Sequence, residues 1–136
     1  MRILLDAMGG DNAPDANIRG AIEAINEVEA EVVLVGQEAI INTKVKEFYG
    51  KDLKEISPRL SVYNATEIID MEDVPTQAIK HKKDSSMVVG FRLLKEGYGD
   101  VFISAGNSGA LLTGATLLVG RIKGVDRPAL AGILPA

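Results

Sequence analysis

A glycine-rich segment follows the first short apolar run of the chain and carries residue types that suit anion binding. It reads Asp6-Ala7-Met8-Gly9-Gly10-Asp11-Asn12-Ala13-Pro14. Adjacent glycines allow positive φ angles and a close approach of the backbone, and the amino end of a following helix offers unpaired N–H groups to an anion. The segment therefore predicts an anion-binding loop built on Gly9, Gly10 and Asp11. The alternative is a tight turn in which Asp6 and Asp11 act as caps.

A second segment of the same kind follows a later apolar run. It reads Ser104-Ala105-Gly106-Asn107-Ser108-Gly109-Ala110. Gly106 and Gly109 free the backbone, and the two polar residues between them, Asn107 and Ser108, place side-chain donors beside another helix amino end. The simpler alternative is a turn with Ser108 as the N-cap. Taken together, the two segments predict a site for a phosphate-sized anion.

Three lysines and two hydroxyls surround the start of another predicted helix, at Lys80-His81-Lys82-Lys83-Asp84-Ser85-Ser86. Ammonium groups and hydroxyls beside a helix amino end can add to an anion site. We expect Lys83, Ser85 and Ser86 to support the site in this way. A run of charges is more often a solvated face, and we expect Lys80 and Lys82 to form one.

The chain has no cysteine and a single histidine, His81. Thiolate nucleophiles, disulfides, iron–sulfur clusters and Cys-based zinc sites are therefore excluded, as are metal sites built from two or three histidines. His81 lies among lysines, so we expect it on the surface and outside any Ser-His-Asp triad. The acidic run Asp70-Met71-Glu72-Asp73 is expected to be a solvated turn, since its spacing does not select a Mg²⁺ site. We expect no metal and no cofactor.

The composition is that of a soluble globular protein. Of the 136 residues, 46% are hydrophobic and 25% charged, which is too apolar for a disordered chain. The net charge of −4 would repel nucleic acid, so no nucleic-acid partner is expected. The first apolar run ends at Asp6, too early for a signal-peptide core. The longest apolar stretch, residues 110–122, is shorter than the ~20 residues that span a bilayer.

Short apolar runs alternate along the chain with segments of helical period. The predicted strands are residues 3–5, 32–35, 60–63, 101–103 and 129–134. The first predicted helix has Pro14 in its first turn and Val28 on its buried face, and the second covers 38–48 with Gly50 at C′. Three more helices are predicted: one begins at Pro75, one is capped by Ser85 or Asp84, and one follows 104–110. Such alternation implies a parallel sheet with helices on both faces. The predicted fold class is α/β, a three-layer αβα arrangement with a mostly parallel, Rossmann-like sheet.

We expect residues 1–136 to form one α/β unit without an internal boundary. The sequence stops at Leu134-Pro135-Ala136, at the end of a predicted strand and without a closing helix. Because an open α/β sheet normally covers both faces, the unit is expected to be incomplete. It would be the N-terminal portion of a longer domain, or be completed by another chain.

Four segments stand in a fixed order: Asp6-Ala-Met-Gly-Gly-Asp11, Lys83-x-Ser85-Ser86-Met87, Ser104-Ala-Gly-Asn-Ser-Gly-Ala110 and Arg127-Pro128-Ala129-Leu130. In this order and spacing, across essentially the whole chain, they resemble the phosphate acyltransferases of bacterial phospholipid synthesis, the PlsX family. Ser108 stands where the family commonly has Thr, and the serine retains the hydroxyl group. Family members are more than twice this length, so further site residues and much of a dimer interface are expected elsewhere.

The resemblance implies an enzyme that moves a fatty acyl group from acyl carrier protein to inorganic phosphate, giving acyl phosphate. It also implies a phosphate acetyltransferase-like fold, a homodimer and a cytoplasmic location, with peripheral attachment to the inner face of the membrane in some members. A phosphate oxygen held near a thioester carbonyl can attack it directly, so no covalent acyl-enzyme is required. The predicted catalytic residues are Asn107 and Ser108, and the predicted phosphate- or substrate-binding residues are Gly9, Gly10, Asp11, Lys83, Ser85, Ser86, Gly106 and Gly109.

Two alternatives stay open. The first is a nucleotide- or dinucleotide-binding domain, against which stand the absence of G-x-G-x-x-G and Walker A patterns and the lack of an acidic residue at Val35-Gly36-Gln37, where the second strand ends. The second is a non-catalytic domain that binds the acidic acyl carrier protein through Lys80, Lys82 and Lys83.

Overall fold

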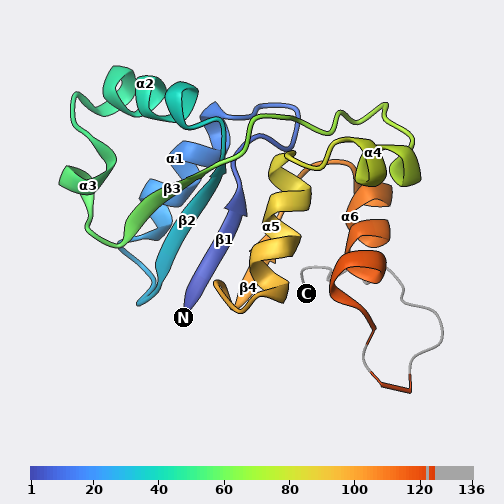
Figure 1. Cartoon of the computed structure of the whole chain (residues 1–136). Helices are drawn as coiled ribbons and strands as arrows, with labels where there is room; N and C mark the ends of the chain where they lie inside the picture. The colour runs from blue at the N-terminus through green and yellow to red at the C-terminus, as the bar shows by residue number, and fades with distance from the viewer. Residues whose placement is uncertain (122, 125–136) are drawn as a thin grey trace, which may run out of the picture.

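The computed structural model describes residues 1–121, 123 and 124, in which four parallel strands alternate with helices (Figure 1). The strands are β1 (Arg2–Asp6), β2 (Glu31–Gly36), β3 (Leu60–Asn64) and β4 (Val101–Ile103), in the sheet order β3-β2-β1-β4. The helices are α1 (Asp15–Ala24), α2 (Glu38–Tyr49), α3 (Leu53–Ile56), α4 (Pro75–His81), α5 (Ser86–Lys95) and α6 (Ser108–Gly114), which continues into a π-helix, η1 (Ala115–Val119). These four strands and the parallel α/β fold class are confirmed. The predicted strand 129–134 and the segment 127–130 lie outside the described residues.

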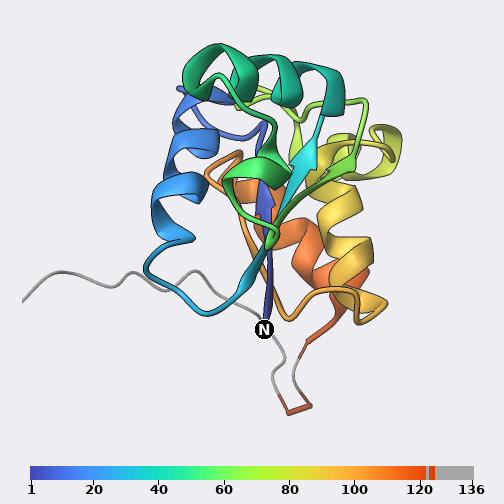
Figure 2. The same ribbon diagram turned by 90° about the vertical axis from the view of Figure 1, so that its left-hand side faces the viewer.

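Helices cover both faces of the sheet, and Figure 2 shows α1 and α5 on opposite sides of the strands. On one face, Leu34 of β2 belongs to a cluster with Ile18 of α1 and Ile41 of α2. On the other face, Leu4 of β1 clusters with Val89 of α5. All five side chains are 0% exposed. A slip of one residue would move a strand's apolar set to the wrong face, so burial fixes both the layers and the strand register.

The helices α4 and α6 lie beside α5, on the side of the molecule opposite α2 and α3 (Figure 1). Phe91 of α5 clusters there with Ile79 of α4 and Ala110 of α6. Gly114 permits this close packing, because a Cβ at that position would lie 2.5 Å from Phe91 Cε2. The cluster fixes α6, and with it the segment that precedes α6.

Two predicted helix caps are confirmed, whereas two predictions about the first helix, α1, differ from the structure. Gly50 stops α2 in the left-handed conformation, with φ 67°, and Ser85 caps α5 by accepting a first-turn N–H at 3.2 Å. Pro14 lies at the N-cap of α1, one position before the predicted first turn. The prediction that Val28 lies on the buried face of this helix is wrong. The chain leaves the helix after Ala24 to turn into β2, and Val28 is 36% exposed.

The short helix α3 was not predicted, because four residues carry too little periodic pattern. A capping box starts it: Asp52 accepts an N–H of the first turn, and Glu55 accepts the N–H of Asp52. Within residues 1–121, no helix combines the length and apolar character needed to cross a bilayer.

Four connections lie at the carboxyl ends of the strands: residues 7–14 after β1, residue 37 after β2, 65–74 after β3 and 104–107 after β4. The helix α5 begins at this same edge, since it runs back to feed the parallel strand β4. Ligands of open α/β sheets bind at this edge. The fold therefore brings both glycine-rich segments to the place where a site is expected.

Candidate anion-binding site

The two glycine-rich segments lie directly against each other. A Cβ on Gly9 would lie 3.0 Å from the backbone N of Gly106, and both glycines are buried. The neighbouring Gly10 has φ +108°, and a Cβ there would lie 3.3 Å from the Cβ of Ala105. The glycines therefore serve close packing of one loop on the other, and Gly10 also serves a left-handed turn.

Asp6 joins the two loops through a buried carboxylate that is 2% exposed. Its Oδ1 accepts the N–H of Met8 at 3.0 Å, and its Oδ2 accepts the hydroxyl of Ser104 at 2.8 Å. The Ser104 Oγ in turn accepts the N–H of Gly106 at 3.1 Å. Asp6 thus caps its own turn, as the simpler alternative expected. The expectation that Asp11 caps is not met, since α1 has no side-chain cap and Asp11 is exposed.

Asn17, on the first turns of α1, holds the first loop from within. Its Nδ2 donates to the carbonyls of Gly9 at 2.8 Å, Ala7 at 3.0 Å and Asp6 at 3.2 Å. Asn17 was not among the residues predicted for the site from the sequence. It could have been predicted from its position, because an amide side chain on the helix immediately after a glycine loop can donate to loop carbonyls that lack a backbone partner.

Asn107 holds the second loop, and its whole amide group is engaged in doing so. The Oδ1 accepts the N–H of Ala110 at 3.1 Å, which makes Asn107 the N-cap of α6. The Nδ2 donates to the carbonyls of Asp73 at 3.0 Å and Asp70 at 3.1 Å, and the side chain is buried. The alternative in which Ser108 is the N-cap is therefore wrong: Ser108 is the first residue of α6, and it is exposed.

Gly109 follows on the first turn of α6 and is half-buried. A Cβ at Gly109 would lie 2.7 Å from Cγ of Pro75, the first residue of α4. The glycine thus lets α4 pack against the start of α6. Ser108 presents the exposed hydroxyl at this end of the site.

Lys82 anchors the connection between β3 and α4, whose carbonyls accept the hydrogen bonds of Asn107. Its Nζ donates to Asp73 Oδ2 at 2.6 Å and to the carbonyl of Ile68 at 2.7 Å, and it lies 3.6 Å from Asp70 Oδ2. The hydrogen bond from Lys82 lowers the pKa of Asp73, and the same bond raises the pKa of Lys82. The expectations of a solvated Lys82 and a purely solvated acidic turn are therefore wrong, because the two charges pair. Within the described ranges, no three acidic or histidine side chains gather closely enough to hold a metal ion.

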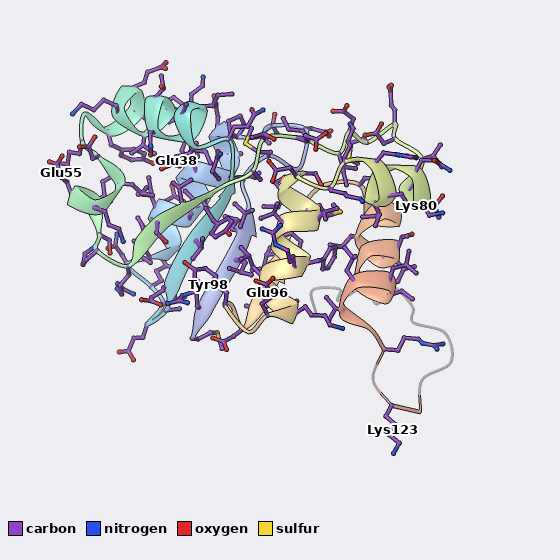
Figure 3. The ribbon with its side chains drawn as sticks, in the orientation of Figure 1. Glu38, Glu55, Lys80, Glu96, Tyr98 and Lys123 are labelled. Carbon is purple, nitrogen blue, oxygen red and sulfur yellow. The ribbon has the colours of Figure 1, made fainter. Side chains whose placement is uncertain are left out.

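Lys80 and His81 are exposed, as expected. Lys80 lies on α4, on the side of the molecule away from α2 and α3 (Figure 3). The Nε2 of His81 lies 3.0 Å from Gln77 Oε1, one turn earlier on the same helix. Neither side chain is brought to the glycine loops.

The serines at the start of α5 are engaged within the fold. Ser85 is 0% and Ser86 2% exposed. Ser85 is the N-cap, and the backbone N–H of Ser86 donates to the carbonyl of Glu67 at 3.1 Å. Lys83 is exposed and lines a groove between α4, α5 and η1 with apolar neighbours such as Val88. Direct ligation by these three residues stays a prediction.

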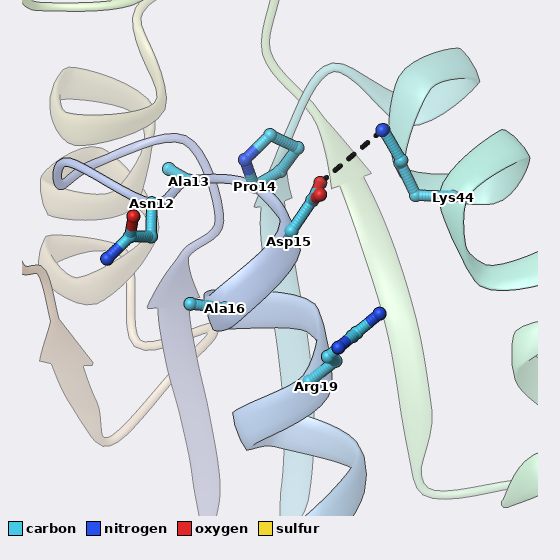
Figure 4. Close-up of a pocket in the computed structure, with 7 residues that line it drawn as sticks. All are labelled: Asn12, Ala13, Pro14, Asp15, Ala16, Arg19 and Lys44. Carbon is cyan, nitrogen blue, oxygen red and sulfur yellow. Dashed lines mark ion pairs between the residues drawn. The ribbon is translucent and has the colours of Figure 1, made fainter. Parts of the chain in front are cut away.

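A cleft of about 610 Å³ opens beside the end of the first loop (Figure 4). It is lined by Asn12, Ala13, Pro14, Asp15, Ala16, Arg19 and Lys44. The guanidinium of Arg19 lies 4.2 Å from the ring centroid of Phe48, and Lys44 Nζ lies 3.6 Å from Asp15 Oδ1. Two cationic side chains, Arg19 and Lys44, therefore lie near the first glycine loop, and Lys44 is paired with Asp15.

The comparison with protein families settles which group of proteins shares this arrangement. A family model described as "Fatty acid synthesis protein" matches residues 1–136. The chain belongs to this family. The resemblance drawn from the four motifs is therefore confirmed at the level of the family.

Curated relatives of this fatty acid synthesis family member carry the name phosphate acyltransferase. The protein of Acetivibrio thermocellus is 54% identical over 136 residues, covering 99% of this chain and 39% of the relative. Those of Alkaliphilus oremlandii and Clostridioides difficile are 49% and 47% identical, each covering 99% of this chain and 39% and 38% of the relative. The chain thus spans about two fifths of the length of these relatives.

Proposed function

We propose that the chain forms the phosphate-binding part of a phosphate acyltransferase. One observation carries the proposal: glycine loops from the adjacent strands β1 and β4 pack together at the carboxyl edge of the sheet. Membership of a fatty acid synthesis family, and the name of the relatives, support the same reaction class. Inorganic phosphate would bind at this edge, where backbone N–H groups and an exposed hydroxyl are available.

The groups that would bind phosphate can be named. Among the hydrogen bonds of the described residues, none uses the N–H groups of Gly10, Ser108 or Gly109. The exposed Ser108 hydroxyl adds a donor next to them. Convergent N–H groups bind oxyanions well, because they carry partial positive charge and need no reorganisation. Asn107 acts in this scheme by holding these donors in place.

The proposed reaction transfers a fatty acyl group from acyl carrier protein to phosphate. A phosphate oxygen attacks the thioester carbonyl carbon, a C–O bond forms, and the C–S bond breaks. The products are an acyl phosphate and the carrier's thiol, which takes up a proton. Attack by a bound phosphate needs no covalent acyl-enzyme. A donor placed at the developing oxyanion contributes about 3 kcal/mol to such a reaction.

The remaining parts of the proposal follow from the family resemblance. They are acyl carrier protein as donor, a homodimer, and a cytoplasmic enzyme with peripheral membrane attachment in some members. Light scattering on the protein at the full length of its relatives tests the dimer. Carrier binding without turnover would favour the non-catalytic alternative.

The decisive experiment measures acyl phosphate formation by the full-length protein. Ser108→Ala is expected to lower kcat/KM for phosphate about tenfold to a hundredfold, through loss of a hydrogen bond to a charged group. Thr43→Ala is the matched control, since that hydroxyl bonds only within α2, to the carbonyl of Ala39. Equal rates for the wild type and Ser108→Ala would remove Ser108 from the site. Binding of ATP or NAD but not phosphate would favour the nucleotide-binding alternative.

A further inference from the structure

We propose that Asp6 and Ser104 are positioning residues that lock the two glycine loops in the arrangement that binds phosphate. The inference rests on the proposed function and extends it to two residues that the sequence analysis did not assign to the site. They are 98 positions apart in sequence, and their side chains meet at 2.8 Å between strands β1 and β4.

The direction of the hydrogen bonds follows from the donors available. A carboxylate only accepts, so the single hydroxyl proton of Ser104 points to Asp6 Oδ2. The lone pairs of Ser104 Oγ then face the N–H of Gly106, which donates to them at 3.1 Å. This hydrogen-bond relay, from the Gly106 N–H through Ser104 to Asp6, turns the Gly106 N–H inward. It thereby fixes the course of the backbone into α6, where the free N–H groups lie.

Gly9 completes the same packed unit. A Cβ on Gly9 would lie 2.6 Å from Asp6 Oδ2 and 3.0 Å from the Gly106 N. The carboxylate, the first loop and the second loop therefore touch at one point, and neither loop can shift without breaking a bond or a contact.

The relay also hydrogen-bonds the negative charge of the Asp6 carboxylate. Asp6 is 2% exposed, and its two oxygens accept the Met8 N–H and the Ser104 hydroxyl. A carboxylate whose lone pairs are engaged repels a nearby anion less than one left unpaired. Removal of the Ser104 hydroxyl would free Oδ2 and release the Gly106 N–H in a single step. Phosphate binding should therefore fall.

The test uses the ¹⁵N-labelled protein at the full length of its relatives, inorganic phosphate, and four variants: wild type, Ser104→Ala, Ser104→Thr and Ser61→Ala, a control hydroxyl on β3. Binding is followed at the amide signals of Gly10, Ser108 and Gly109. Ser104→Ala should raise the Kd for phosphate about tenfold, while Ser104→Thr, which keeps the hydroxyl, should restore it to within about threefold of wild type. The thermal midpoints of Ser104→Thr and Ser61→Ala should stay within a few degrees of wild type, whereas that of Ser104→Ala should fall, because a buried carboxylate oxygen loses its donor.

Two results overturn the inference. Ser104→Ala could bind phosphate as tightly as wild type, or Ser104→Thr could bind as weakly as Ser104→Ala. Asp6→Asn provides a second variant, since it keeps the shape but replaces one acceptor by a donor, and it should weaken binding to a similar degree. Failure of the proposed function looks different: in the wild-type full-length protein, phosphate would then leave these amide signals unmoved.

Discussion

The two glycine loops occupy equivalent positions at the ends of neighbouring strands, yet they are held in different ways. The first loop is held by its own following helix, because Asn17 donates to three carbonyls within residues 6–9. The second is held by distant segments. Ser104 reaches back to Asp6, and Asn107 reaches the carbonyls of residues 70–73.

The first loop is therefore a self-contained turn, held mainly by the helix that follows it, whereas the second loop is a junction between distant segments. The hydrogen bonds from Asn17 to the first loop span at most eleven residues, so they can form as soon as α1 packs on β1. The second loop joins three parts of the chain, and it holds a connection that exposes Met71 and Val74 at 56% and 60%. Disturbing the second loop should therefore affect more of the molecule than disturbing the first.

The largest expected effect is that of Asn107→Ala. Loss of an N-cap costs about 0.5–2 kcal/mol, and unpaired carbonyls in residues 70–73 add to it, for a total of about 3 kcal/mol. Urea unfolding measures the loss. Amide hydrogen exchange should quicken both at the start of α6 and in residues 68–74.

Asn17→Ala is the matched variant for the first loop. Its faster exchange should stay within residues 6–17, with exchange in residues 68–74 unchanged. If both variants loosened the same residues, the distinction between a self-contained turn and a junction would be wrong.

A smaller effect is expected for Gly9→Ala, which tests the contact between the loops. The new Cβ would meet Asp6 Oδ2 at 2.6 Å and backbone N of Gly106 at 3.0 Å. Overpacking of this kind costs about 1–3 kcal/mol. Gly20→Ala is the control, because nothing lies within 4 Å of its Cβ position in α1, and it should stabilise by about 0.5–1 kcal/mol. Equal unfolding midpoints for the two variants would show that the loops do not touch at Gly9.

The smallest effect concerns pH and the pair of Asp73 and Lys82. The hydrogen bond from Lys82 holds the pKa of Asp73 below its ordinary value of 3.8. A carboxyl with a lowered pKa stabilises the fold above its ordinary pKa, and this contribution is lost as pH falls through the folded-state pKa. The raised pKa of Lys82 acts in the opposite direction: its contribution is present below 10.5 and lost as pH rises through the raised value.

Unfolding of wild type and Asp73→Asn as a function of pH checks the pair. The difference in stability should be greatest between about pH 5 and pH 10 and shrink toward either end. It should be small, because both side chains are 29% exposed and water screens their charges. A difference that stays constant from acid to alkaline pH would contradict the ion pair.

The inner strands β1 and β2 could be predicted because a central parallel strand is apolar on both faces, as Val32 to Val35 are. Gly50 and Ser85 were equally predictable, since a left-handed stop and an N-cap depend on one residue type at one position. The predictions failed where neighbouring elements decide. Val28 continues a helical period, yet the chain has already turned toward β2.

By itself the sequence indicated that two glycine loops would follow two strands of one parallel sheet and so stand at one edge of it. That these two strands are neighbours was decided by the tertiary structure. Only the tertiary structure decided what each polar side chain there does. Asn107 and Ser108 are neighbours in sequence, but one is buried among distant carbonyls and the other faces solvent. Lys82 and Lys83 differ in the same way. A hydrogen bond depends on a partner's position to within a fraction of an ångström, and here the partners lie up to 98 residues away.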